Sequence, residues 1–241
     1  MRVLIPLCGD TPLDDEQPVS LVQVHNKTIL EYVLGNLPFG DAARFVFVVR
    51  KKDCQKHHLD AILNILEPEA AIVRVEGSTK GQLCTCLMGI EHIDDDAPLL
   101  IVNGNQFLYE DTQRIVEGFA KSGADAGIVT FPNVHPRWSY VRTDVDGVTV
   151  LETSEKRPIS RQACAGIFWF ARGADFVDAA KRVIRKKNEV GDQYYVSSTF
   201  NELILAGKRV IAHEIPADHF HGLHTKEGVD AFLSAMQEKS Y

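Results

Sequence analysis

The chain lacks the features that mark secreted, membrane-bound or zinc-binding proteins. Its 241 residues include five cysteines, an odd number, and no two have the spacing of a zinc ribbon or a thioredoxin motif. No apolar run is long enough to span a membrane, and neither a signal peptide nor a lipidation motif is visible. We therefore expect a cytoplasmic protein with reduced, buried thiols and no membrane partner.

The chain also lacks an excess of basic over acidic residues. Lys and Arg total 26 against 33 Asp and Glu, which gives a formal net charge of -7. Because proteins that bind a nucleic-acid backbone usually carry a basic face, this balance argues against a nucleic-acid partner. An acidic chain can still bind a nucleotide, since backbone amides and one or two side chains are enough.

Short apolar runs and helically spaced segments alternate along the first half of the chain. Runs typical of buried strands lie at residues 2–7, 44–49, 70–75, 98–102 and 126–131. Segments with helical spacing lie at residues 28–37, 53–66, 83–90 and 110–122. This alternation predicts an α/β fold, with a mostly parallel, Rossmann-like sheet covered by helices on both faces.

The second half of the chain changes character. Residues 139–143 and 148–151 flank an Asp-Gly turn and predict a β-hairpin. Further strands are predicted at 165–170 and 209–213, and further helices at 174–187, 194–205 and 226–238. No internal repeat or linker interrupts the chain, so we expect one domain over residues 1–241.

The first predicted strand ends in a glycine turn, where ligands of α/β sheets usually bind. Gly9 allows a sharp turn at no steric cost, and with Asp10 and Thr11 it can direct backbone amides and a hydroxyl at a triphosphate. The alternative is a tight turn without a ligand. Residues 10–16 include four acidic side chains, which would repel a triphosphate unless a metal ion intervenes.

Several motifs follow one another in a fixed order. They are LVQVHNKTILEYVL at 21–34, TKGQLCTCL at 79–87, WSY at 138–140, EKRPIS at 155–160, AGIFWF at 165–170, NELI at 201–204 and LHTKE at 223–227. Together they resemble the sugar-phosphate nucleotidyltransferases, or NDP-sugar pyrophosphorylases, over nearly the whole chain. The resemblance implies a glycosyltransferase-A-like fold with a nucleotide-binding half at about 1–131 and an acceptor-binding half, containing the hairpin, at about 132–241.

The resemblance also implies an activity. Such enzymes transfer a nucleotidyl group from an NTP to a sugar phosphate or similar small phosphate, release pyrophosphate, and feed glycan or capsule synthesis. The implied partners are an NTP and a phosphorylated acceptor, the implied cofactor is Mg²⁺, and a homo-oligomer is allowed. Because the transition state gathers negative charge, the site must supply amides, cations and a divalent ion.

The motifs assign candidate site residues by resemblance. The nucleotide-binding candidates are Leu7, Gly9, Asp10, Thr11, Gly81, Gln82, Asn103 and Asn105. The acceptor-binding candidates are Tyr140, Glu155, Lys156, Gly166 and Asn201. Gly81 and Gln82 suit hydrogen bonding to a base edge, or alternatively only begin a helix. Glu155 can accept sugar hydroxyls while Lys156 meets a phosphate, or the two form an ion pair at a hairpin edge.

Three family positions differ in this sequence. The loop arginine has no counterpart, the lysine of the Pro-Lys pair falls on Val19, and Asn105 stands where the magnesium aspartate is expected. Losing one transition-state contact typically costs about 2.7–4 kcal/mol. Turnover at an ordinary rate therefore requires other side chains that stabilise the negative charge of the transition state. The candidate cations are Lys27, Lys80 and Arg137, each of which also fits a surface position.

Two alternatives to the enzyme stay open. One is a catalytically degenerate relative that binds a nucleotide or NDP-sugar as a sensor or partner subunit. The other is a glycosyltransferase-like protein, for which Asp144-Val-Asp146 has the metal-motif spelling but lies in the predicted hairpin turn.

A histidine cluster near the carboxyl end lies outside the family pattern. His219, His221 and His224 follow Asp218, and the first two would share one face of an extended segment. With that aspartate, the three histidines are candidate ligands for zinc or another first-row metal. Asn105 is a separate candidate metal ligand, at the position where the resemblance places Mg²⁺. The histidines could also supply positive charge near a phosphate, or be loop histidines at the surface.

Overall fold

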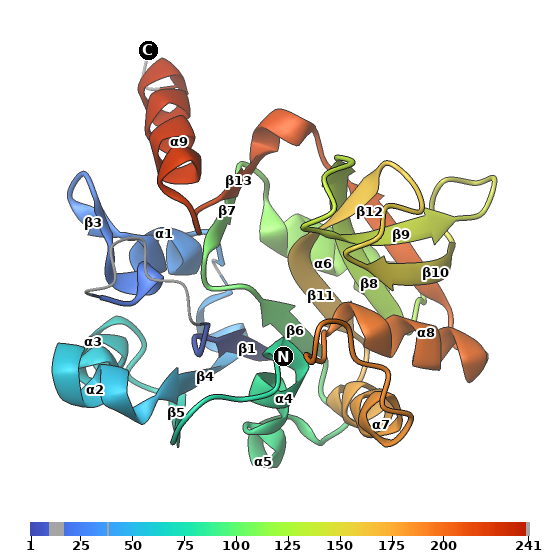
Figure 1. Cartoon of the computed structure of the whole chain (residues 1–241), viewed down its shortest axis with the longest axis horizontal. Helices are drawn as coiled ribbons and strands as arrows, with labels where there is room; N and C mark the ends of the chain where they lie inside the picture. The colour runs from blue at the N-terminus through green and yellow to red at the C-terminus, as the bar shows by residue number, and fades with distance from the viewer. Residues whose placement is uncertain (10–16, 38, 240–241) are drawn as a thin grey trace.

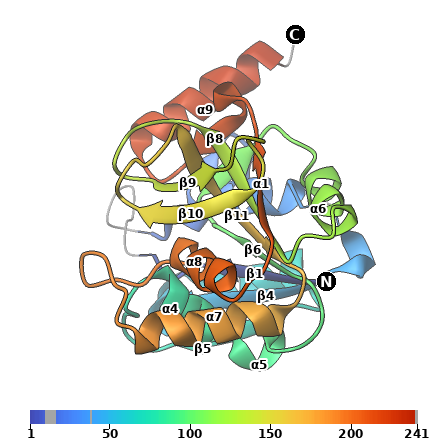
Figure 2. The same ribbon diagram turned by 90° about the vertical axis from the view of Figure 1, so that its right-hand side faces the viewer.

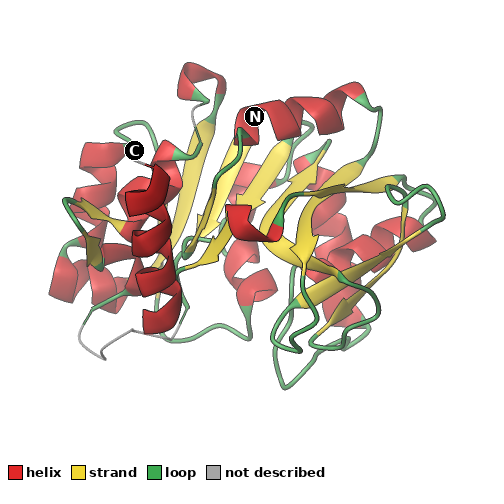
Figure 3. Cartoon of the chain, turned by 90° about the horizontal axis from the view of Figure 1, so that it is seen from above, coloured by secondary structure: helices red, strands yellow, loops and turns green. Residues whose placement is uncertain are grey.

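One sheet of nine strands runs through the centre of the molecule, with helices on both faces (Figures 1 and 3). The computed structural model describes residues 1–9, 17–37 and 39–239. The main path of the sheet is β10-β9-β11-β6-β1-β4-β5, with β8 paired to β11 and β12 paired to β8. The predicted α/β fold, with a hairpin in its second half, is confirmed.

The strand bounds are β1 (Arg2–Pro6), β2 (Gln23–Val24), β3 (Lys27–Thr28), β4 (Arg44–Arg50), β5 (Ala71–Val75), β6 (Leu99–Val102), β7 (Gln106–Leu108), β8 (Ala126–Pro132), β9 (Ser139–Thr143), β10 (Val150–Glu155), β11 (Gln162–Phe170), β12 (Val210–Glu214) and β13 (Phe220–Gly222). The helix bounds are α1 (Ile29–Gly35), α2 (Lys51–His57), α3 (Leu59–Leu66), α4 (Gln82–Leu87), α5 (Ile90–Ile93), α6 (Thr112–Lys121), α7 (Gly173–Arg185), α8 (Ser197–Leu205) and α9 (Lys226–Lys239). Within the described ranges, none of these helices has both the length and the apolar character needed to cross a membrane.

The parallel half of the sheet places two loops side by side. β1 lies between β4 and β6 and runs parallel to both. β4 pairs on its other side with β5, which is also parallel. Because parallel strands end at the same edge, the loops after β1 and β6 meet there. Leu7 packs against the second loop so closely that a Cβ at Gly104 would lie 2.2 Å from its Cδ2 atom.

The antiparallel half is built around β11. This strand pairs with β6, β8 and β9, and β9 forms the predicted hairpin with β10. Its register with β8 shifts between Cys164 and Phe168. Gly166 lies within that shift and adopts a left-handed φ of 72°, a conformation that glycine accepts without strain.

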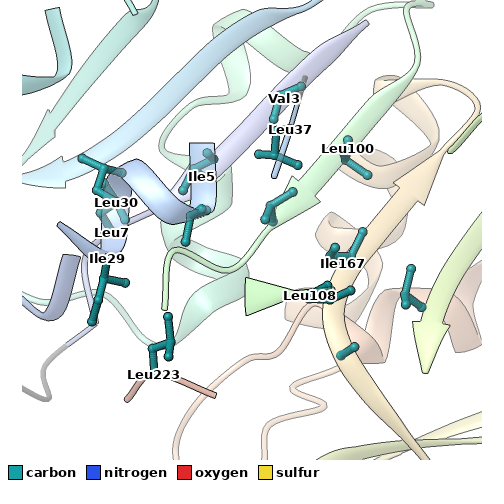
Figure 4. Packing of buried hydrophobic residues seen from close by; sticks show 14 of the residues in the cluster. Val3, Ile5, Leu7, Ile29, Leu30, Leu37, Leu100, Leu108, Ile167 and Leu223 are labelled. Atoms are coloured by element: carbon teal, nitrogen blue, oxygen red, sulfur yellow. The ribbon is translucent and has the colours of Figure 1, made fainter. Parts of the chain in front are cut away.

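Apolar side chains fill both faces of the sheet. On one face, Val3 and Ile5 of β1 pack with Ile29 and Leu30 of α1 (Figure 4). On the other face, Leu4 belongs to the cluster under α4, α7 and α8, and Figure 2 shows α7 and α8 next to each other. β1 is therefore buried on both sides, as its continuous apolar run predicts.

Helix boundaries differ from the sequence prediction, and two of the differences change the local structure. The single helix predicted at residues 53–66 is two helices, because His58 adopts a left-handed conformation with φ 56° that ends α2. The helix predicted to begin at Tyr194 begins only at Ser197. The Tyr194 backbone instead donates to Lys80 O at 2.9 Å and accepts from Leu83 N at 3.1 Å.

Candidate functional site

A cleft of about 450 Å³ opens where the loops after β1 and β6 meet the start of α4 and the end of the hairpin. It brings together residues that are widely separated in the sequence. The predicted nucleotide-binding and acceptor-binding residues that line it are Leu7, Gly9, Gly81, Gln82, Asn103, Asn105, Glu155 and Gly166, and the candidate cation Arg137 lines it too. Asp10 and Thr11 lie outside the described residues.

One wall of the cleft, here called the base side, is the turn that leads into α4. Gly81 has a φ of 93°, and a Cβ at this position would lie 2.5 Å from the Tyr194 carbonyl oxygen. The hydroxyls of Thr79 and Thr85 lie 2.6 Å apart and brace the same turn. The backbone can approach Tyr194 this closely only because residue 81 is glycine.

The floor of the cleft consists of neutral amides. The Gln82 side chain donates a hydrogen bond to Asn103 Oδ1, and the Asn103 backbone N–H donates to Gly166 O at 3.0 Å. A Cβ at Gly166 would lie 2.2 Å from Gln106 Oε1 and 2.4 Å from Asn103 Nδ2. Gln106 Nε2 is buried, with no hydrogen-bond partner in the described part of the chain. None of the sequence motifs singles out Gln106, although it directly follows Asn105.

The opposite wall, here called the acceptor side, carries a partly buried carboxyl group. Glu155 Oε2 accepts hydrogen bonds from Ser139 Oγ at 2.5 Å and from Ser197 Oγ at 2.8 Å. Burial raises the pKa of Glu155 above its ordinary value, although both hydroxyls and the Lys156 charge act in the opposite direction. No sequence motif indicates that Ser197 lines the cleft, and the WSY motif is the only sequence signal for Ser139.

Three acceptor-side candidates do not line the cleft. The Lys156 ammonium lies 5.0 Å from the centre of the Tyr195 ring. Tyr140 is fully buried and donates its hydroxyl to His135 O at 2.6 Å. The Asn201 amide accepts from Thr153 N at 2.8 Å and donates to Thr153 O at 2.9 Å. Tyr140 and Asn201 therefore hold the framework of the acceptor side.

The cleft has little positive charge. Val19, in a short 3-10 turn at Val19–Leu21, lines it in place of the expected lysine. Lys27 lies 5.9 Å from the Tyr32 ring, and neither Lys27 nor Lys80 lines the cleft. Within residues 1–9, 17–37 and 39–239, Arg137 is the one cationic side chain that does.

The described side chains do not fit a Mg²⁺ site. Mg²⁺ prefers carboxylate and water oxygens in octahedral geometry, whereas Asn105 offers one neutral amide oxygen. No group of three His, Cys, Asp or Glu side chains able to hold a metal occurs among the residues that the structure describes.

The three candidate histidines have separate surroundings instead. His219 Nδ1 lies 2.8 Å from Glu110 Oε1, while the His221 and His224 rings pack edge-on against Tyr109 and Trp138. Burial lowers the pKa of His224, and the Arg137 charge lowers it further. The metal site predicted from these histidines is therefore not formed by the described residues.

Comparison with known proteins places the chain in a family. The sequence profile of the nucleotidyl transferases matches residues 11–216. The chain belongs to this family. No protein of curated function matches this nucleotidyl transferase in sequence.

Solved structures share its fold. The nucleoside-diphosphate-sugar pyrophosphorylase from Vibrio cholerae RC9 superimposes with a TM-score of 0.82 at 21% identity, over 96% of this chain and 99% of that one. A putative glucose-1-phosphate thymidylyltransferase from Bacillus anthracis, in complex with a sucrose, gives 0.76 at 16% identity, over 98% and 95%. A UDP-glucose pyrophosphorylase complexed with UDP-glucose gives 0.77 at 15% identity, over 99% and 98%.

Proposed function

We propose that this nucleotidyl transferase transfers a nucleotidyl group from an NTP to a sugar phosphate, or to a similar small phosphate, in the cleft. The observation that carries the proposal is the continuous amide floor. It runs from Gln82 through Asn103 to Gly166 and joins the base side to the acceptor side. A ligand that spans both walls then places its phosphates between them.

The proposed roles follow from the chemistry of each group. Gly81 and Gln82 contact the base of the nucleotide. Gly81 lets the backbone approach the base, and the Gln82 side-chain amide can form hydrogen bonds with the base edge. Glu155 accepts acceptor hydroxyls through the oxygen that the two serines leave free. An acceptor phosphate oxygen attacks the α-phosphorus of the NTP as the bond to pyrophosphate breaks.

The setting of the reaction is also a proposal. Products would serve glycan or capsule precursor synthesis in the cytoplasm, without a nucleic-acid partner, and the whole chain would act as one domain. Mg²⁺ is the cofactor that the family implies. When bound it would offset phosphate charge, but the described residues do not supply its ligands, so no step here depends on it.

A second candidate is binding without turnover, as a sensor or partner subunit. Val19 and Asn105 favour it, because they put an apolar side chain and a neutral amide where the family resemblance calls for a lysine and an aspartate. Both groups would normally stabilise developing negative charge.

Thermal unfolding separates these candidates. The full chain is heated with ATP, CTP, GTP, UTP and common NDP-sugars, with and without Mg²⁺, and each stabilising nucleotide is then tested for pyrophosphate release with a panel of sugar phosphates. Gln82→Leu should abolish the nucleotide-dependent stabilisation, whereas Gln55→Leu on the exposed face of α2 should preserve it.

The outcomes are distinct. Pyrophosphate release supports transfer, and stabilisation without release across the acceptor panel supports the binding protein. Absence of stabilisation by any nucleotide would overturn both.

A further inference from the structure

Two cationic residues, Arg137 and Lys156, border the acceptor side of the cleft. Arg137 adjoins Trp138 and Ser139, which both line the cleft, and Lys156 follows Glu155. The family resemblance gives the acceptor phosphate to Lys156. The surroundings of the two side chains differ in a way that reverses this assignment.

Lys156 is engaged elsewhere. Its backbone has a left-handed φ of 54°, and its ammonium lies over the Tyr195 ring, 5.0 Å from the centre. The electron-rich face of the ring attracts the ammonium and favours this position. Tyr195 lines the cleft but Lys156 does not, so the lysine side chain would have to leave the ring to meet a ligand in the cleft.

Arg137 lines the cleft, and its guanidinium is not neutralised by an ion pair with a described carboxylate. Its guanidinium lies 6.0 Å from the Trp138 ring, and its Nε donates only a long hydrogen bond, 3.3 Å, to His135 Nδ1. Arg142 and Arg172, by contrast, are paired with carboxylates at 2.9 Å and 2.5 Å. In the part of the chain that the structure describes, no carboxylate lies within ion-pair distance of Arg137.

We infer that Arg137, and not Lys156, binds the phosphate of a phosphorylated sugar on the acceptor side. A guanidinium fork can donate two parallel hydrogen bonds to one phosphate, whereas an ammonium acts as a point charge. Glu155, which lines the same wall, would take sugar hydroxyls. The ligand class is therefore a hydroxyl-rich anion, either a free sugar 1-phosphate or the sugar phosphate of an NDP-sugar. This inference rests on the proposed function.

Calorimetric titration of the full chain tests the assignment. The probes are the 1-phosphates of glucose, galactose, mannose and N-acetylglucosamine, the matching UDP-sugars, UMP and free glucose. Arg137→Gln is compared with Lys156→Gln, and Arg142→Gln is the matched control because that arginine does not line the cleft.

Arg137→Gln should weaken the tightest sugar 1-phosphate by about tenfold or more, the typical effect of removing a hydrogen bond to a charged group. It should also reduce the salt dependence of that affinity, while UMP affinity stays within twofold. An equal loss for the matching UDP-sugar identifies the NDP-sugar as a ligand of the same group. A loss confined to the sugar 1-phosphate identifies the free acceptor.

Either of two results would overturn this inference and leave the proposed function standing. One is unchanged sugar-phosphate affinity in Arg137→Gln, and the other is a larger loss of that affinity in Lys156→Gln than in Arg137→Gln. Wild-type protein that binds UMP but no phosphorylated sugar would also overturn the inference and leave the base side intact. Wild-type protein that binds neither UMP nor a UDP-sugar, and that no NTP or NDP-sugar stabilises in the thermal-unfolding panel, would overturn the proposed function itself.

Discussion

The carbonyl oxygen of Tyr194 lies 2.5 Å from the point that a Cβ at Gly81 would occupy. The contact joins the base-side turn to the segment before α8, more than a hundred residues further along the chain. Tyr194 N also lies 2.8 Å from the same point, so both sides of the peptide backbone pack against the glycine. This contact fixes one wall of the cleft against another part of the fold.

Gly81→Ala should therefore destabilise the protein and weaken nucleotide binding together. The new methyl group displaces the Tyr194 backbone, and alanine disfavours the φ of 93°. We expect the free energy of unfolding in urea to fall by about 1–3 kcal/mol. Gly118→Ala is the control, since its Cβ would meet nothing within 4 Å in the middle of α6. Wild-type stability and wild-type nucleotide affinity in Gly81→Ala would contradict this role.

Asn105→Asp should create Mg²⁺ binding at the cleft. The carboxylate has nearly the shape of the amide but adds the charge that a hard cation prefers, and the Asn105 carbonyl can still accept from Leu223 N at 2.8 Å. Mg²⁺ at ten times its Kd should raise the free energy of unfolding by about 1.4 kcal/mol. Differential scanning calorimetry with and without Mg²⁺ measures this, with Asn188→Asp as the charge control. If Mg²⁺ leaves the Tm of Asn105→Asp unchanged, position 105 is not near a usable metal site.

Glu155→Gln should change how stability depends on pH. Burial raises the folded-state pKa of this carboxyl above its ordinary value of 4.5, so the folded protein holds the proton more tightly than the unfolded chain. The stabilisation from that proton is complete below the unfolded pKa and is lost as pH rises through the folded pKa. Glutamine stays neutral and can still accept from Ser139 and Ser197.

Relative to Glu155→Gln, the wild-type protein should therefore lose stability as pH rises from about 4 toward 7. Urea unfolding of both proteins across that range measures the difference. Glu91→Gln, an exposed position on α5, controls for the loss of one negative charge. A difference that stays constant with pH, or that changes with the opposite sign, would rule out the raised pKa.

Asn201→Ala should lower stability without affecting acceptor binding directly. Its amide makes both of its hydrogen bonds to the Thr153 backbone and joins α8 to β10. Removing it leaves a partly buried N–H and C=O without partners, at a cost of about 1–3 kcal/mol. Urea unfolding measures that loss and calorimetric titration the sugar-phosphate affinity, with Asn188→Ala as the exposed control. Weakened acceptor binding at wild-type stability would instead place Asn201 in the acceptor site.

Several parts of the cleft could be predicted from sequence because they depend on local patterns. Gly81 and Gln82 form one short motif, and Glu155 belongs to another, so resemblance assigned both before the structure placed them in one cleft. The motif resemblance also predicts Tyr140 and Asn201 in the site. Periodicity and motifs cannot show whether a polar side chain faces the cleft or bonds to nearby backbone, as both of these do.

The sequence by itself determined the order of the strands of the main sheet and of most helices, because buried runs and helical spacing are properties of neighbouring residues. The short strands β2, β3, β7 and β13 carry no such pattern and were not predicted. The run at residues 2–7 needed no partner to be recognised as a strand covered on both faces. Tertiary structure alone decided which charges the cleft contains. It placed the partly buried Glu155 carboxyl between serines 16 and 42 residues away, and it placed Lys156 on an aromatic ring and Arg137 at the cleft. Such choices depend on desolvation and on contacts between distant segments, and these exist only once the chain has folded.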